Sequence, residues 1–229
     1  MNFLAHALPY LDRPLLAIST GVPDWLSVVD RRIRAREKRA IQFIDSEDLE
    51  LRMVAGGVMR HIEDDRWFHG TEAFVTLNLQ LAVELRDLLP GDEGFRPTFV
   101  GHILIEMLLD SFWLRDDPSL GQRYYQCFDS SVAHAVQLCV NVITGKPTDQ
   151  LTAVIARFAE SRFLYDYLEP DRMLVRLNQV MTRVGLPHLP AAVGGWLSRA
   201  SDLVESRRRD LLTPPGRSPS PFILPSNEP

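Results

Sequence analysis

Residues 56–69 read GGVMRHIEDDRWFH, and this stretch decides the fold that we expect. It places His61, Asp65 and His69 at successive steps of four residues. An α-helix has 3.6 residues per turn, so steps of four drift by only about 40° and the three side chains share one face. Apolar residues upstream, from Ile41 onward, keep the same period. The pattern predicts a helix with one stripe of potential metal ligands.

A second stretch repeats this spacing with His102, Glu106 and Asp110. Two helices packed with their stripes inward would gather three imidazoles and three carboxylates around one point. Such buried charges need a partner, and a divalent metal ion suits them, with Mn, Fe or Zn favoured over Mg by the imidazoles. We therefore predict a metal site, with His69 and Asp110 one turn away from its centre. The predicted central ligands are His61, Asp65, His102 and Glu106.

The apolar periodicity is helical along most of the chain, and no alternating β-branched run competes with it. Asp149 has the position of an N-cap for a helix that begins at Leu151. We expect one all-α domain over residues 1–211, followed by a Pro- and Ser-rich, poorly ordered tail over residues 212–229. The other expected helical segments are residues 77–88, 99–113, 120–143, 171–184 and 191–211.

The composition argues against several classes of protein. A net charge of −5 gives no support to a nucleic-acid partner, and the basic run at residues 30–39 is expected to be a solvated helix face. No apolar run reaches the roughly 18 residues of a membrane span, and the start lacks the basic n-region of a signal peptide. Cys127 and Cys139 lie in an apolar stretch and fit a reducing compartment. The cytoplasm is therefore the expected location.

Two residues near the start are further candidates. His6 closes the apolar opening MNFLAH, and Asp24 stands directly before Trp25, where a helix N-cap would lie. The opening resembles that of the acyl carrier protein phosphodiesterases, members of the HD-type metal-dependent phosphohydrolase group. That family continues with a Gly-x-x-x-Asp-like element, which the segment from Gly21 to Asp24 approximates.

The resemblance covers roughly residues 1–210. Gly57, His61 and Asp65 fall on the Gly-x-x-x-His-x-x-x-Asp helix of the family. The segment from His102 to Glu106 matches a later Asp-x-x-x-Asp-His element. The opening motif is the most specific of these features, and the later ones are degenerate.

The chain also departs from the family's pattern. Ile62 stands where the family usually has Arg, and His69 and His102 stand where it has carboxylates. The ligand set is thus less negative, which favours Zn, Fe or Mn over Mg. The resemblance implies an HD-like fold in which the metal is held by His6, Asp24, His61, Asp65, His102, Glu106 and His69.

The activity implied by the resemblance is hydrolysis of a phosphoester or phosphodiester in a small molecule, such as a phosphopantetheine-like group. The net charge of −5 fits poorly with binding of an acidic carrier protein, so we expect a different substrate. The metal would activate a water molecule, with Asp64 or Glu106 as general base and Arg60 as a clamp on the phosphate. Two alternatives stay open: an HD-like di-iron oxygenase, and a non-catalytic helical protein that binds metal.

Overall fold

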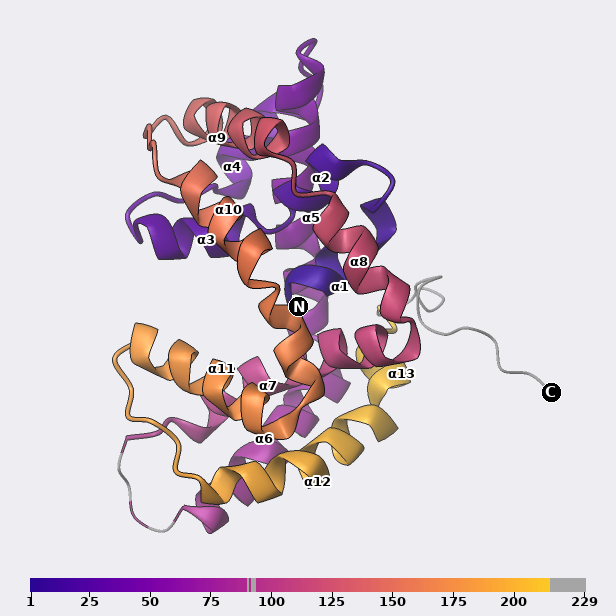
Figure 1. Cartoon of the computed structure of the whole chain (residues 1–229), viewed down its shortest axis with the longest axis vertical. Coiled ribbons are helices and arrows are strands. Elements are labelled where there is room, and N and C mark those ends of the chain that lie inside the picture. Colours follow the sequence, from indigo (N-terminus) through magenta and orange to yellow (C-terminus); the bar gives the residue numbers. More distant parts are fainter. Residues whose placement is uncertain (90, 92–93, 215–229) are drawn as a thin grey trace, which may run out of the picture. The chain divides into compact units, whose positions relative to one another are not determined.

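The computed structural model describes residues 1–89, 91 and 94–214, and Figure 1 traces them. Every regular element within these ranges is helical and none is a strand, so the predicted all-α class is confirmed. Among the same residues, none of the helices combines the length and apolarity needed to span a lipid bilayer. Most of the predicted tail, residues 215–229, lies outside the described residues, while Leu212 is buried.

The chain divides into two compact units, and neither is one continuous stretch of sequence. Unit 1 contains Met1, Phe3–Arg66 and Pro118–Phe163, and unit 2 contains Asn2, Trp67–Asp117 and the chain from Leu164 onward. Beyond residue 3, the first crossing falls inside the long helix α5, which spans Leu49–His69. The last falls inside the short 3₁₀ helix η3. The crossing between Asp117 and Pro118 lies in a short polar connection, whereas the crossings inside α5 and η3 have no linker that could mark them in the sequence.

Unit 1 is built around a cluster of aromatic rings. Phe158 lies at its centre, with ring centroids 4.7 Å from Phe3 and 5.3 Å from Trp25. Helix α10 packs against α9 and α3, and α2 also packs against α9. Apart from α5, the helices of this unit are α1 (Phe3–Ala7), η1 (Leu8–Tyr10), α2 (Pro14–Ser19), α3 (Val22–Val29), α4 (Glu37–Ala40), η2 (Ile41–Phe43), α8 (Pro118–Gln126), α9 (Ser130–Thr144) and α10 (Leu151–Ser161).

Helix α5 approaches α2 closely because Gly57 has no side chain. A Cβ atom at this position would lie 2.5 Å from Cβ of Ser19 and 2.9 Å from the carbonyl oxygen of Leu16. These are contacts that real Cβ atoms do not make, so only glycine fits here without moving α2. Gly57 lies one turn before His61, and it therefore fixes the depth of that imidazole in unit 1.

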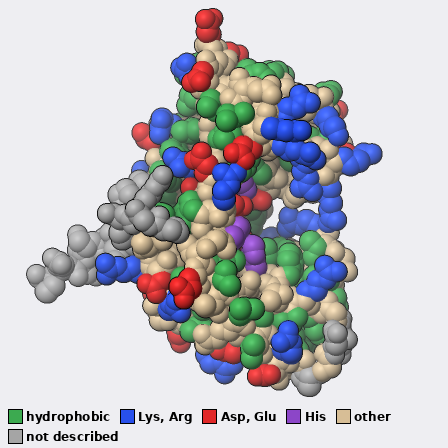
Figure 2. Space-filling view, turned by 180° about the vertical axis from the view of Figure 1, so that it is seen from behind, with side chains coloured by type: hydrophobic (Ala, Val, Ile, Leu, Met, Phe, Trp, Pro, Cys, Tyr) green, Lys and Arg blue, Asp and Glu red, His purple; other side chains and the backbone are tan. Residues whose placement is uncertain are grey.

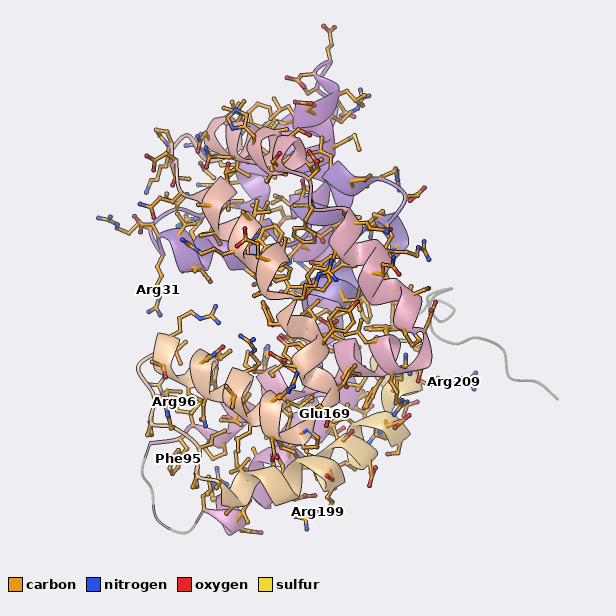
Figure 3. The ribbon with its side chains drawn as sticks, viewed as in Figure 1. Arg31, Phe95, Arg96, Glu169, Arg199 and Arg209 are labelled. Carbon is orange, nitrogen blue, oxygen red and sulfur yellow. The ribbon has the colours of Figure 1, made fainter. Side chains whose placement is uncertain are left out.

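Unit 2 is built around α7 (Pro97–Asp116), which is buried on most of its surface because α6, α11 and α12 all contact it. Arg96 precedes it with a left-handed φ of 51°, and Pro97 occupies the first turn, so the helix begins sharply (Figure 3). The other helices of this unit are α6 (Glu72–Leu88), α11 (Pro170–Arg183), α12 (Ala192–Ser206) and α13 (Arg208–Leu211), and η3 spans Phe163–Leu168.

Three local predictions were wrong. The expected helical segment over 120–143 is split, because the Asp129 side chain accepts a hydrogen bond from the Ser131 amide and caps a new helix. Gln150, not Asp149, is the N-cap residue of α10, and it makes no side-chain cap bond. The basic run is not a helix face before Glu37. Its exposed arginines alternate with buried Ile33 and Ala35, an extended pattern, and Lys and Arg side chains gather on one face in Figure 2.

Candidate metal centres

Unit 1 contains a group of three potential metal ligands, His6, His61 and Asp65. One ligand atom of each residue lies within 4.8 Å of the corresponding atoms of the other two. His6 comes from α1, while His61 and Asp65 lie one turn apart on α5. Both imidazoles are buried, and the Asp65 side chain keeps 31% of its exposure. The group is therefore buried on its histidine side and reaches solvent on its carboxylate side.

The two imidazoles of this group approach different oxygens of one carboxylate. Nε2 of His6 lies 3.3 Å from Oδ1 of Asp65, and Nε2 of His61 lies 3.4 Å from Oδ2. The two rings are 4.3 Å apart between centroids. The amino group of Met1 is a further partner, 2.6 Å from Oδ1 of Asp65, and the Met1 carbonyl oxygen is 3.0 Å from Nε2 of His6. The carboxylate thus already has a cationic neighbour.

Burial and neighbouring charges shift the pKa values of the three residues in this group. Burial, followed by the positive charge of His6, lowers the pKa of His61 to about 3. Burial alone would also lower the pKa of His6, but hydrogen bonds with Asp64 and Asp65 raise it above its ordinary value. The pKa of Asp65 is lowered despite burial, because His6 and the Met1 amino group favour its ionised form. His61 is therefore neutral at pH 7, the form in which an imidazole binds metal.

Asp64 and Arg60 have different surroundings from those that the sequence predicted. Oδ2 of Asp64 lies 3.4 Å from Nδ1 of His6, the ring nitrogen that faces away from Asp65. A carboxylate in this position orients a ligating histidine, so positioning suits Asp64 better than the role of general base. Arg60 lies 3.3 Å from Glu63 and 3.9 Å from Asp64. Its guanidinium therefore belongs to an ion-pair cluster at the surface of α5.

Asp24 belongs to neither group of potential ligands found among the described residues. It is half-buried in the first turn of α3, where the positive end of the helix dipole stabilises a carboxylate. It is also not the N-cap, since that position belongs to Gly21. The predicted ligand role of Asp24 thus finds no support in this arrangement.

Unit 2 contains a second group, formed by His69, His102 and Glu106. Nε2 of His69 lies 2.8 Å from Oε1 of Glu106, and Nε2 of His102 lies 3.1 Å from the same oxygen. The imidazole rings are 4.5 Å apart between centroids. His102 and Glu106 lie one turn apart on α7, and His69 is the last residue of α5. Here both imidazoles converge on a single carboxylate oxygen.

The second group is more open than the first. The side chains of His69 and His102 keep 28% and 33% of their exposure, while Glu106 keeps 12%. Burial alone would raise the pKa of Glu106, but the hydrogen bonds from His102 and His69 help to hold it well below its ordinary value. A carboxylate that is ionised so readily is a good ligand and a weak general base. The geometry therefore favours Glu106 as a ligand over its predicted catalytic role.

The structure thus arranges the predicted ligands as two groups of three, each contained in one unit. Asp110 is fully buried on α7 and belongs to neither group. The sequence did not indicate the Met1 carbonyl beside His6, because a backbone oxygen has no residue-type signature. It also did not indicate the division between His61 and Asp65 on one side and His69 on the other, since all three share one helical stripe.

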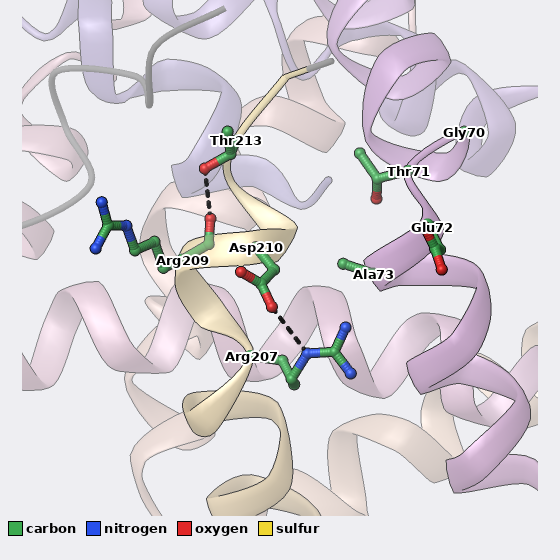
Figure 4. Close-up of a pocket in the computed structure, with 8 residues that line it drawn as sticks. All are labelled: Gly70, Thr71, Glu72, Ala73, Arg207, Arg209, Asp210 and Thr213. Atoms are coloured by element: carbon green, nitrogen blue, oxygen red, sulfur yellow. Dashed lines mark hydrogen bonds and ion pairs between the residues drawn. The ribbon is translucent and has the colours of Figure 1, made fainter. Parts of the chain in front are cut away.

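A pocket of about 620 Å³ also lies in unit 2, between the start of α6 and α13 (Figure 4). Its lining begins at Gly70, which directly follows His69. Arg207 in this lining is paired with Asp210 at 3.0 Å. The lining contains two arginines and two carboxylates, so its formal charges balance. The lining residues are Gly70, Thr71, Glu72, Ala73, Arg207, Arg209, Asp210 and Thr213.

Compared with models of known protein families, with curated proteins and with solved structures, the chain gives no match. The resemblance of its opening to the acyl carrier protein phosphodiesterases therefore stays a prediction. The functional argument then depends on the two groups of ligands. Both have residue types and spacings that could bind a metal ion.

Proposed function

We propose that the protein is a metal-dependent hydrolase of phosphoesters or phosphodiesters, acting from the group in unit 1. One observation carries this proposal: two buried imidazoles converge on the carboxylate of Asp65, which itself reaches solvent. Three protein ligands with one open side are typical of catalytic metal sites, whereas structural sites are closed by a fourth protein ligand. The group can hold an ion and still leave a position for water.

In this proposal, each residue of the unit 1 site has a different role in binding the ion or the phosphate. A divalent ion in this site would lower the pKa of a bound water molecule and offset the charge of a phosphate group. His61 supplies a neutral nitrogen, and Asp65 supplies the negative charge. Asp64 contacts Nδ1 of His6 and fixes the direction of that ring. Arg60, half-exposed beside Glu63, offers a guanidinium that could exchange one oxyanion partner for a phosphate.

The composition of the ligand set limits the metal and the substrate. Two nitrogen ligands and one carboxylate favour Mn, Fe or Zn over Mg. The net charge of −5 disfavours an acidic carrier protein as partner, so a small-molecule phosphoester or a phosphopantetheine-like group is the substrate that we propose. We also place the protein in the cytoplasm and give it neither a nucleic-acid nor a membrane partner.

An iron-dependent oxygenase is the second candidate. Each group consists of two histidines and one carboxylate, the ligand composition of mononuclear non-haem iron sites that activate oxygen. The same composition also serves zinc hydrolases, so the ligands alone do not separate the two candidates. Oxygen consumption by the iron-loaded protein, without hydrolysis, would favour the oxygenase.

The test begins with elemental analysis of the purified full chain. Hydrolysis of bis(p-nitrophenyl) phosphate is then measured after loading with Mn²⁺, Zn²⁺, Fe²⁺ or Mg²⁺. Asp65→Asn is the test variant, and His188→Gln is the matched control, because His188 is exposed and hydrogen-bonded to Thr182. We expect metal-dependent hydrolysis that the control retains and Asp65→Asn loses.

Two outcomes would contradict the hydrolase. Equal rates in the metal-loaded chain and in Asp65→Asn would remove the role of the unit 1 group. Stoichiometric metal without turnover, combined with unfolding by a chelator, would instead indicate a non-catalytic protein that is stabilised by its ion.

A further inference from the structure

We propose that unit 2 holds a metal centre of its own, in which His69, His102 and Glu106 bind a transition-metal dication such as Zn²⁺ or Fe²⁺ and leave one coordination position open. This inference goes beyond the proposed hydrolase, because it requires a second ion and uses no residue of the unit 1 group. It also assigns His69 to the centre itself, although the sequence placed this residue one turn away.

The three ligand atoms are already gathered at nearly the required separations. The nitrogens of His69 and His102 lie 2.8 and 3.1 Å from Oε1 of Glu106. Metal–ligand bonds of about 2.0–2.2 Å at tetrahedral angles place neighbouring ligand atoms about 3.4 Å apart. The two nitrogen–oxygen separations thus differ from the required value by only a few tenths of an ångström, and the two imidazole nitrogens lie within 4.8 Å of each other. No rearrangement of α5 or α7 is needed.

The scaffold around this group holds the imidazole rings in place. Phe74 is buried, and its ring centroid lies 4.9 Å from that of His69 and 5.1 Å from that of His102. Phe74 is itself fixed, because its amide donates to Oγ1 of Thr71, the N-cap of α6. Glu106 lies on α7, which three other helices enclose. The cost of ordering the ligands has thus largely been met by packing before an ion arrives.

Charge and access also favour a cation at this point. His69 is the last residue of the 21-residue helix α5, where the negative end of the helix dipole attracts positive charge. Glu106 supplies a full negative charge. The two imidazoles are partly exposed and so give an ion a path from solvent. The fourth position of the ion would therefore face water.

The test counts ions on the full chain. Metal-free protein is titrated with Co²⁺, whose visible absorption reports coordination, and Zn²⁺ is then used to displace it. The variants are His102→Gln and the isosteric Glu106→Gln, and His134→Gln is the control because His134 is exposed outside both groups. We expect both variants to bind one ion fewer than the wild type, or to weaken one site at least 100-fold. The control should match the wild type.

A second measurement uses the unmodified chain, so it does not depend on how the variants fold. Diethyl pyrocarbonate modifies exposed imidazoles, and mass spectrometry locates the product. We expect Co²⁺ to protect His69 and His102 but not His134 or His188. Equal modification of His69 and His102 with and without Co²⁺ would overturn the second centre.

The two proposals fail in different ways. If Asp65→Asn has no effect on hydrolysis while His69 and His102 are protected, the hydrolase fails and the unit 2 centre stands. If hydrolysis depends on Asp65 while Co²⁺ gives no protection in unit 2, the hydrolase stands and the second centre fails.

Discussion

The two histidine–carboxylate groups contain the same kinds of ligand in different surroundings. In unit 1, each imidazole faces its own oxygen of Asp65, and burial holds the pKa of His61 down to about 3. In unit 2, both imidazoles share one oxygen of Glu106 and remain half-exposed. The histidines of the first group are thus buried, whereas those of the second are open to solvent. We expect an ion in unit 1 to exchange slowly and one in unit 2 to exchange rapidly.

Each group also has a helical glycine close to one of its histidines, and the two glycines differ in what they touch. A Cβ atom at Gly57 would meet Cβ and backbone atoms of α2 at 2.5–2.9 Å. At Gly101, which directly precedes His102, it would meet Oδ1 of Asn78 at 2.6 Å, the end of a side chain that can turn away. A Cβ atom at Gly101 would also lie 3.3 Å from the backbone oxygen of Asn78 and 3.4 Å from Cβ of Leu81. Both glycines therefore allow close packing against a neighbouring helix, and the approach to backbone atoms is closer at Gly57.

The largest expected effect separates the two groups by their ions. Asp65→Asn should lower metal-dependent hydrolysis more than about 100-fold, because even the outer partners of metal ligands are worth 10–100-fold. The unit 2 ion should stay bound, since its ligands are unchanged. Turnover and the Co²⁺ spectrum of one sample measure both effects. Simultaneous loss of both ions would break the comparison, because the two groups would then act as one centre.

The next effect is on stability. Gly57→Ala should lower the free energy of unfolding by about 2 kcal/mol, because the added methyl group meets the backbone of α2 and overpacks the contact. Gly56→Ala is the matched control, since its Cβ would make an ordinary contact of 3.6 Å with Leu16. Its free energy of unfolding should rise by up to about 1 kcal/mol, because alanine has a higher helix propensity than glycine. Urea unfolding measures both variants, and equal midpoints would refute the assigned role of Gly57.

A smaller effect sharpens the description of the first group. Asp64→Asn should weaken metal binding by unit 1 about tenfold, because the amide holds His6 less firmly than the carboxylate does. Glu63→Gln serves as the control, since Glu63 contacts Arg60 and is not one of the ligands. Isothermal titration with Zn²⁺ provides the affinities. If both variants behave alike, Asp64 has only a surface role.

The smallest effect concerns a carboxylate outside both groups. Glu84 accepts hydrogen bonds from Trp196 and Arg199, and these lower its pKa below the ordinary 4.5. A depressed folded pKa stabilises the fold above pH 4.5, and this contribution is lost as the pH falls further. We expect less than about 1 kcal/mol, because the Glu84 side chain is partly exposed and solvent screens the interaction. Urea unfolding at pH 7 and pH 3.5 should show a weaker pH dependence in Glu84→Gln than in the wild type.

Local pattern was sufficient for the all-helical class and for the ligand stripes, although not for every helix boundary. The four-residue steps at His61 and His102 correctly placed each histidine one turn from a carboxylate, because helical geometry depends only on nearby residues. The partner of each stripe was harder to predict. His69 contacts Glu106 across 37 residues of sequence, and such pairing is decided by packing that no local pattern records.

The sequence also gave no sign of two compact units. A boundary is visible in a sequence when a polar or flexible linker marks it, and here one crossing lies between Arg66 and Trp67 inside α5. Asp24 illustrates a related difficulty. Its resemblance to a family element suggested a ligand, while the structure places it in the first turn of α3 and outside both groups of potential ligands.

The interleaved chain path has a consequence for how such a protein could arise. All three ligands of the unit 2 group lie between residues 67 and 117, but α11 and α12, which pack against α7, come from beyond residue 164. A gene fragment that encodes residues 67–117 would carry these ligands together with α6 but without α11 and α12, and it would begin in the middle of α5. The unit 2 group and all of its packing partners therefore cannot be moved together as one continuous segment of sequence.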